Sequence, residues 1–200
     1  YTSPFRTRGH ILSVKTVPMF APTPVTDSFF WFVMSDLKRP NAKQPAYRFL
    51  AEQGLEVFTP MTWRLTLRQG KRVREERPFL PDLLFVHCAR PLLDPLVELV
   101  PTLQYRYIRG AYCEPMTVAD ADMERFIRAV RSTDSPRYYL PGELTSAHYG
   151  RMVRIVGGPL DGCEGRLLSV RGSRVKRLLV DIPNLLTAGV EVQPEYIQVL

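Results

Sequence analysis

The amino-acid sequence predicts an α+β fold: an amino-terminal α/β sandwich with an antiparallel sheet and a basic hairpin, followed by a small five-stranded β-barrel. Strand and helix patterns alternate through residues 29–131, which is typical of a sheet packed against helices. Residues 132–146 are rich in Ser, Thr and Pro and are predicted to be a linker. Residues 147–200 carry only short strand patterns separated by glycines, which favours a barrel. Residues 1–28 contain four prolines and no sustained periodicity, so we expect a flexible extension there.

The first elements of the sandwich are a strand and a helix. Residues 29–34 are a β-prone aromatic run, long enough for one buried strand. Pro45 suits the first turn of a helix, because the first amides of a helix have no intrahelical partner and proline has no amide hydrogen. Gly54 then marks the end of that helix.

A basic hairpin is predicted next. Polar and apolar residues alternate up to Arg68, Gln69-Gly70 marks a turn, and a polar arm returns to Arg77. Between Arg64 and Arg77, six basic side chains stand against two acidic ones, a local net charge of +4. Such an arm either follows a phosphate backbone or is a solvated hairpin whose charges keep its edges from aggregating. The residues alone leave both interpretations open.

Further strands and helices complete the first half. Residues 83–87 are the most apolar strand in the sequence, residues 92–99 suit a short helix, and residues 103–108 suit another strand. A capping-box-like pattern at Thr117–Asp120 is expected to open the last helix. One apolar face of that helix follows the spacing i, i+3, i+4, i+7, at Met123, Phe126, Ile127 and Val130.

Five short strands are predicted in the second half. Glycines separate several of them, and their spacing suits a small barrel that is closed to remove its exposed edges. The strands are expected at residues 152–156, 166–170, 175–182, 190–192 and 196–200.

Composition narrows the class of protein. The 200 residues carry 27 Lys and Arg against 20 Asp and Glu, a formal net charge of +7, which favours polyanionic partners only weakly. Three widely spaced cysteines argue against a disulfide framework and favour a reducing cytoplasm. No apolar run approaches the ~18 residues of a membrane span, and no signal-peptide pattern opens the sequence. We therefore expect a cytoplasmic protein with no membrane partner, and a monomer.

The sequence contains no catalytic or metal-binding constellation. Its three histidines, His10, His87 and His148, have no metal-ligand spacing with a cysteine or with one another. The adjacent His87 and Cys88 face opposite sides of a strand and form no nucleophilic pair. The run Gly157–Gly162 lacks the Lys-Ser/Thr pair of a phosphate loop. We therefore expect no enzymatic activity, no metal and no cofactor.

Two stretches of the sequence together resemble the NusG family of transcription elongation factors. The first comprises Val57–Met61, the basic turn Gln69–Arg72 and then Phe79–Val86, which is similar to the family's F-P-x-Y-x-F-V strand. The second, Gly150–Arg166, resembles the KOW motif, a strand, a G-P-x-x-G-x-x-G-type turn and a second strand. Ribosomal proteins share the KOW motif, so the resemblance rests on both stretches occurring in this order.

The resemblance implies a factor without a catalytic site that binds RNA polymerase. In the family, the amino-terminal domain docks an apolar patch on the clamp helices of the largest polymerase subunit and approaches upstream or non-template DNA. The KOW domain recruits a further partner, such as a ribosomal protein or another factor. The residues expected to bind polymerase are Leu83, Phe85 and Tyr107. Those expected to face nucleic acid are Lys38, Arg39, Lys43, Arg64, Arg68, Lys71, Arg72 and Arg74. Those expected at the partner-facing edge of the KOW domain are Leu160, Cys163 and Leu185.

Departures from the family pattern favour a specialised paralogue. Leu80, Asp82 and Leu83 replace the common Phe, Gly and Tyr, and Cys163 stands where the general factor has a partner-contacting aromatic residue. These changes favour an antitermination factor of the RfaH/UpxY type, directed at particular operons such as those for surface polysaccharides. One alternative is the general NusG elongation factor. The other is a KOW-containing RNA-binding or ribosome-associated protein, although residues 141–200 carry only seven basic against six acidic side chains.

Overall fold

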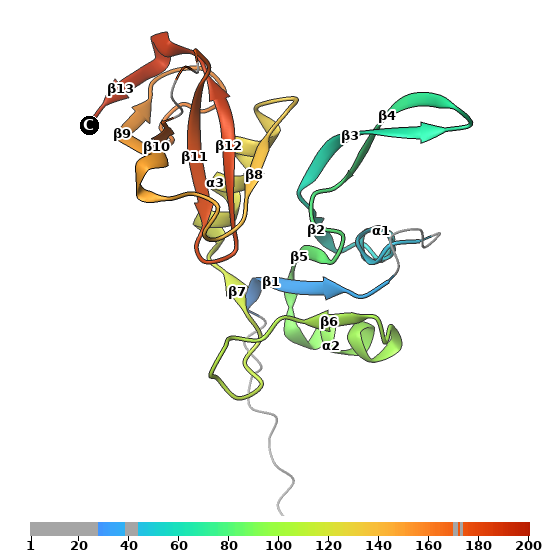
Figure 1. Ribbon diagram of the computed structural model, residues 1–200. Coiled ribbons are helices and arrows are strands. Elements are labelled where there is room, and N and C mark those ends of the chain that lie inside the picture. Colours follow the sequence, from blue (N-terminus) through green and yellow to red (C-terminus); the bar gives the residue numbers. More distant parts are fainter. Residues whose placement is uncertain (1–27, 39–43, 170–171, 173) are drawn as a thin grey trace, which may run out of the picture.

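The computed structural model describes residues 28–38, 44–169, 172 and 174–200. Two sheets lie on either side of one helix, α3 (Asp120–Arg131), and a long hairpin projects from the first sheet (Figure 1). The α+β fold class is confirmed. The predicted extension, apart from Ser28, lies outside the described residues, as do Arg39 and Lys43.

The amino-terminal sheet is antiparallel. Its strands are β1 (Phe29–Asp36), β2 (Glu56–Phe58), β5 (Leu83–Ala89), β6 (Leu103–Tyr105) and β7 (Thr117–Val118). They run in the order β2-β5-β1-β6, and β7 also pairs with β1. The two central strands are buried on both faces, which explains why their sequences are apolar without alternation. The strands predicted at 29–34 and 83–87 are confirmed, whereas the strand predicted at 103–108 ends at Tyr105.

Helices α1 (Ala46–Glu52) and α2 (Arg90–Leu99) cover one face of this sheet. α1 begins directly after Pro45, and Gly54 beyond its end has a φ of 82°, so the predicted start and stop of this helix are confirmed. Asp36 connects β1 to α1, because its buried carboxylate accepts hydrogen bonds from the backbone amides of Lys38 and Ala46. The helices and the sheet share an apolar cluster that includes Phe32, Met34, Leu50, Leu84, Val86 and Leu93.

The predicted hairpin consists of β3 (Met61–Arg68) and β4 (Lys71–Pro78). The strands pair residue by residue from Met61 with Pro78 to Arg68 with Lys71. Gln69 and Gly70 both have positive φ, 49° and 76°, as a two-residue turn that matches the twist of the strands requires. This turn determines the register, and therefore decides which side chains share a face of the hairpin.

Helix α3 covers the other face of the amino-terminal sheet. Its predicted apolar face is confirmed, because Met123 and Phe126 are fully buried while Ile127 and Val130 are partly buried in the same cluster. The predicted capping box is wrong. Pairing with β1 draws Thr117 into β7, so Ala119 precedes the helix and supplies no side-chain cap.

The carboxy-terminal sheet contains the five predicted strands. One short 3₁₀ turn, Ser146–His148, precedes the first of them, and another, Pro194–Tyr196, precedes the last. The strands are β9 (Tyr149–Ile155), β10 (Glu164–Leu168), β11 (Lys176–Ile182), β12 (Leu186–Val192) and β13 (Ile197–Val199). A sixth strand, β8 (Arg137–Tyr139), comes from the predicted linker and pairs with β12. The order is β13-β9-β10-β11-β12-β8, and within the described residues no pairing of β13 with β8 closes it. The predicted closed five-stranded barrel is therefore wrong, because β8 occupies the edge of β12.

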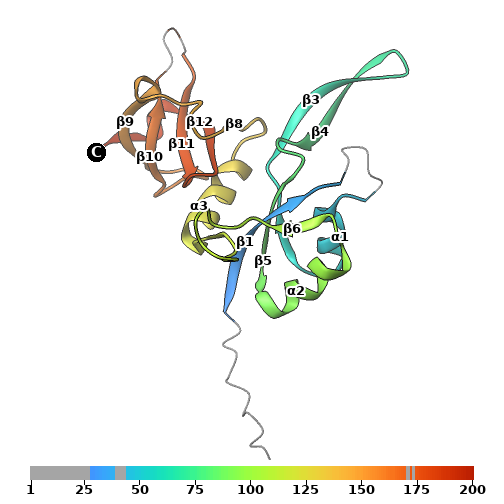
Figure 2. The same ribbon diagram turned by 60° about the horizontal axis from the view of Figure 1, so that its bottom comes forward.

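One apolar cluster runs from the amino-terminal sheet through α3 into the carboxy-terminal sheet. α3 packs against β1 on one side and against β11 and β12 on the other (Figure 2). Phe126 is central to it: the centre of its ring lies 6.1 Å from that of Phe58 in β2 and 6.4 Å from that of Tyr138 in β8. The two halves of the chain therefore share a core.

Candidate nucleic-acid and partner interfaces

The projecting hairpin has two chemically different faces. Directly paired residues of an antiparallel hairpin lie on the same face, and successive residues of a strand alternate between faces. The register therefore separates a Glu75 face from a Trp63 face. The Glu75 face carries Arg64, Thr66, Arg68, Lys71, Val73, Glu75 and Arg77. The Trp63 face carries Met61, Trp63, Leu65, Leu67, Arg72, Arg74 and Glu76.

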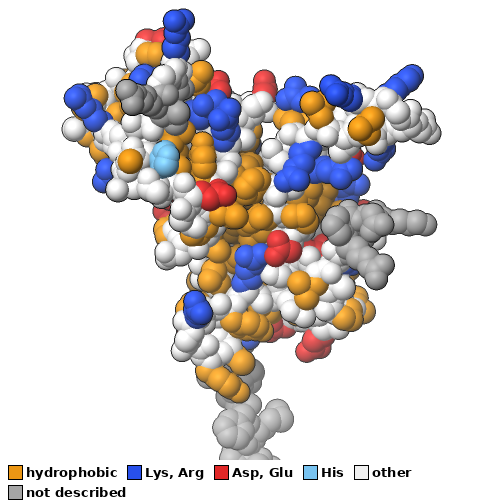
Figure 3. Space-filling view, in the orientation of Figure 1, with side chains coloured by type: hydrophobic (Ala, Val, Ile, Leu, Met, Phe, Trp, Pro, Cys, Tyr) orange, Lys and Arg blue, Asp and Glu red, His pale blue; other side chains and the backbone are white. Residues whose placement is uncertain are grey.

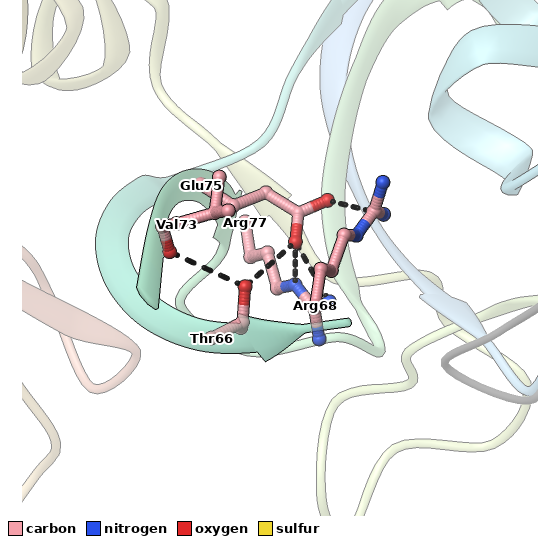
Figure 4. A network of polar contacts seen from close by, with 5 residues as sticks. All are labelled: Thr66, Arg68, Val73, Glu75 and Arg77. Carbon is pink, nitrogen blue, oxygen red and sulfur yellow. Dashed lines mark hydrogen bonds and ion pairs between the residues drawn. The ribbon is translucent and has the colours of Figure 1, made fainter. Parts of the chain in front are cut away.

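The Glu75 face is organised by one carboxylate (Figure 4). Glu75 accepts hydrogen bonds from Arg77 at 2.8 and 3.0 Å and from Arg68 at 3.2 Å. The Thr66 hydroxyl lies 3.4 Å from the same carboxylate and from the carbonyl oxygen of Val73. The hydrogen bond from Arg77 is the main reason why the pKa of Glu75 is lowered. Arg64 and Lys71 form no ion pair with any described residue, so their charges are available to an anionic partner.

The lowered pKa of Glu75 predicts a pH response of the hairpin. Because the folded-state pKa lies below the usual 4.5, the ion pairs persist above that value and are lost as the pH falls through the folded-state pKa. We expect NMR titration of the Glu75 carboxyl group to give a midpoint below 4.5. Arg77→Ala should raise this midpoint, whereas Arg90→Ala on α2 should leave it unchanged. A native midpoint at or above 4.5 would contradict the network in Figure 4.

The Trp63 face combines exposed apolar side chains with arginines. Leu65 and Leu67 are 73% and 74% exposed, although they lie in the middle of a strand. Arg72 pairs directly with Leu67, and the Arg74 guanidinium lies over the Trp63 ring, 4.6 Å from its centre. The hairpin thus presents cations on both faces but apolar surface mainly on one. The alternation of polar and apolar residues in Trp63–Arg68 is visible in the sequence. Only the register of the hairpin shows that Arg72 and Arg74 lie on the same face as its apolar side chains.

The hairpin brings together all five of its predicted nucleic-acid residues. Arg64, Arg68 and Lys71 lie on the Glu75 face, and Arg72 and Arg74 lie on the Trp63 face. Lys38 lies apart from them in sequence, two residues after the end of β1, where its ammonium group donates to the carbonyl oxygen of Gln44 at 3.1 Å.

The three predicted polymerase contacts do not share a surface. Leu83 and Phe85 are 1% and 0% exposed, within the cluster beneath α3. Tyr107 is 51% exposed and lies next to Tyr105, whose side chain belongs to the cluster on the opposite face of the sheet. In this structure the three residues therefore form no single exposed patch, because α3 covers one face of β5, and their role in polymerase binding stays a prediction.

Residues 29–127 match the family model described as "Transcription termination factor nusG". Through this domain, the chain belongs to the NusG family. The solved structure described as "Domain interaction in Thermotoga maritima NusG" is similar to it, with 15% identity over 86% of this chain and 98% of that chain and a TM-score of 0.42. No curated protein matches the sequence. The family resemblance seen in the sequence is confirmed.

The predicted partner-facing edge beyond the NusG domain is mostly buried. Leu160 and Cys163 are 4% and 2% exposed, because the turn after β9 folds inward and its backbone bonds Cys163 to both Leu160 and Ile155. Arg128 of α3 donates a hydrogen bond to the Cys163 sulfur at 2.7 Å. Leu185 is half-buried beside the same cluster. These three residues therefore form no exposed edge in this structure, and their role in partner binding stays a prediction.

The described part of the chain has no group of three or more His, Cys, Asp or Glu side chains arranged to hold a metal ion. Among the same residues, no helix is long and apolar enough to cross a membrane. Thr59 and Tyr138, which are distant in the sequence, line one cavity that only the folded chain brings together.

Proposed function

We propose that this NusG-family protein is a transcription elongation or antitermination factor that binds RNA polymerase and promotes processive transcription of particular operons. The observation that carries this proposal is the NusG domain at residues 29–127 with its projecting basic hairpin. NusG-family factors act in transcription without catalysing a reaction, and they bind RNA polymerase. The protein would accordingly act in the cytoplasm, as a monomer, without a metal or cofactor.

The hairpin is proposed as the arm that faces upstream or non-template DNA. It projects from the NusG domain in both views of the molecule, clear of the carboxy-terminal sheet (Figures 1 and 2). Its six basic side chains outnumber its two acidic ones, and only Arg68 and Arg77 are held by Glu75. Phosphates of a nucleic acid would replace water around the remaining cations and release counterions, which makes the contact sensitive to salt.

Charge reversal at the tip of the hairpin tests this role. We expect Lys71→Glu with Arg72→Glu to weaken binding of a polymerase elongation complex and to lower the slope of log affinity against log salt by about 1.4, roughly 0.7 for each lost single-strand contact. The matched control is Arg174→Glu with Lys176→Glu, which changes the net charge equally at two exposed residues, one just before β11 and one at its start. If neither pair of substitutions changes binding of the elongation complex, the hairpin is a solvated arm without a role in nucleic-acid binding.

The polymerase-docking face is proposed to be the α3-covered face of the NusG domain, where Leu83 and Phe85 lie. In this structure α3 and the carboxy-terminal sheet cover that face. Docking through it would therefore require α3 to move, whereas Tyr107 is accessible without any rearrangement. Recovery of core RNA polymerase with the tagged chain from the native host tests the proposal, and failure to recover polymerase would overturn it.

The carboxy-terminal sheet is proposed to be a KOW domain of a specialised paralogue. Its support is the Gly150–Arg166 motif, with Cys163 buried against Arg128 instead of an aromatic side chain facing a partner. Such a surface would bind the termination factor weakly. Titration of the full chain with the host's termination factor and ribosomal proteins tests this, and tight binding of the termination factor would favour the general elongation factor.

A further inference from the structure

The outer edge of strand β3 in the hairpin is open to pairing with a further strand. Within the described residues, β3 and β4 pair only with each other. The amide of Phe79 donates to the carbonyl oxygen of Pro60 at 2.8 Å, so these two residues form a hydrogen-bonded pair at the base of the hairpin. Hydrogen-bonded and non-hydrogen-bonded pairs alternate along an antiparallel ladder, and therefore the backbone groups of Trp63, Leu65 and Leu67 point away from β4. No described residue bonds to them.

The two edges of the hairpin differ in their protection against such pairing. Sheet edges in native proteins are usually blunted by charged side chains or by proline. On β4, the residues whose backbone groups point outward are all charged: Arg72, Arg74 and Glu76. On β3 the corresponding residues are all apolar, and Leu65 and Leu67 are largely exposed. Figure 3 shows hydrophobic side chains among basic ones on the projecting hairpin. The edge of β3 is therefore the one suited to receive a partner.

The side chains along β3 define the chemistry that an added strand needs. Successive residues of an added strand alternate between the two faces of the sheet. Those on the Trp63 face lie beside Leu65 and Leu67 and are therefore expected to be apolar. Those on the Glu75 face lie beside the arginines of β3, of which Arg64 forms no ion pair with any described residue. Acidic side chains complement these arginines, because opposite charges on paired strands attract.

We propose that the edge of β3 binds an extended segment of a partner protein in which apolar and acidic residues alternate. The segment adds an antiparallel third strand to the hairpin, with main-chain hydrogen bonds to Trp63, Leu65 and Leu67. Its acidic side chains complement the hairpin's net charge of +4, which opposes pairing with the hairpin of a second copy. A nucleic acid would neutralise the cations but leave the exposed leucines and the outward backbone groups without partners. The inference goes beyond the proposed function, because it requires neither polymerase nor DNA.

The test uses the full-length chain and a synthetic peptide of about nine residues in which valine and glutamate alternate. NMR follows the exchange of backbone amide protons with deuterium. The bound peptide is expected to slow exchange at Trp63, Leu65 and Leu67 at least about 10-fold, because these amides become hydrogen-bonded. The amides of Arg72 and Arg74, on the edge of β4, should exchange at an unchanged rate. N-methylation of the valines, whose amides face β3, should abolish binding, whereas N-methylation of the glutamates should preserve it.

Two sets of variants test the side-chain chemistry of the edge. Leu65→Thr with Leu67→Thr retains β-propensity but removes the apolar strip, and it is expected to weaken peptide binding roughly 10-fold. Its control is Val73→Thr, a similar change at an exposed residue of β4. Arg64→Glu is expected to weaken binding roughly 3- to 10-fold, whereas Arg151→Glu, at an exposed residue of β9, should not. All these side chains are exposed, so circular dichroism should show a native fold in each variant.

Three results would overturn the inference. The first is unchanged exchange at the β3 amides with about 1 mM peptide, a concentration at which even weak specific binding is visible. The second is slowing of the same amides by a single-stranded DNA oligonucleotide but not by the peptide, which assigns the edge to nucleic acid. The third is dimerisation of the chain in sedimentation that Leu65→Thr with Leu67→Thr removes, which assigns the edge to a second copy. Peptide binding at the edge without recovery of RNA polymerase supports the inference and overturns the proposed function.

Discussion

Phe126→Ala is expected to lower the free energy of unfolding by about 3–5 kcal/mol, because it leaves a large cavity in a fully buried position. The ring contacts Phe58 of the NusG domain and Tyr138 of β8, so its loss also weakens the packing between the two halves of the chain. We expect urea denaturation to show the lower stability and limited proteolysis to cut residues 132–146 faster. Phe30→Ala is the control, because Phe30 is a half-exposed aromatic residue outside this cluster.

The same variant reports on polymerase docking. Loosening α3 exposes the face that holds Leu83 and Phe85, so a folded Phe126→Ala chain is expected to recover more RNA polymerase than the native chain. Circular dichroism at low temperature establishes that the variant is folded before the comparison. Unchanged recovery by the folded variant would place the docking surface elsewhere on the NusG domain.

Phe85→Asp is expected to unfold the NusG domain. Phe85 is completely buried in the central strand β5, and its ring packs near Phe58. Truncating a buried phenylalanine costs about 3–5 kcal/mol, and burying an unpaired carboxylate adds several more. That total approaches the whole stability of a typical domain, about 5–15 kcal/mol. We expect loss of the cooperative transition in thermal denaturation and of dispersed NMR signals.

Loss of polymerase binding by Phe85→Asp would therefore not identify a docking residue. Tyr107→Ala is the informative companion, because Tyr107 is half-exposed and its loss should leave the fold intact. A cooperative, native-like melting transition in Phe85→Asp would contradict the burial of this strand. Reduced polymerase recovery with folded Tyr107→Ala would support Tyr107 as a contact.

Local patterns in the sequence were sufficient to predict most of the helices and strands, but not β7 or β8. The apolar runs at 29–34 and 83–87 became the central strands, and Pro45 and Gly54 bounded α1. The dipeptide Gln69-Gly70 formed the hairpin turn, which fixed the register of β3 and β4 and gathered the basic side chains. These features depend on neighbours in the sequence, such as turn geometry and hydrophobic periodicity, and so they can be recognised without the fold.

Contacts between distant segments overturned the predicted exposure of several site residues. Strand periodicity could show that Leu83 and Phe85 share a face, but not that α3 covers it. A motif could place Leu160 and Cys163 in a turn, but not show that the turn folds inward beside Arg128. The predicted closed barrel failed for the same reason, since β8 comes from the predicted linker and pairs with the edge of β12.

The sequence by itself determined the family, the order of the helices and strands other than β7 and β8, and the charge of the hairpin, because each depends on residues close together along the chain. Only the tertiary structure decided which apolar faces are covered and which are open. It alone brought Thr59, Trp63, Arg131 and Tyr138 around one cavity. The physical reason is that an apolar face is buried only when another segment packs against it. Here the covering segment comes from a distant part of the sequence.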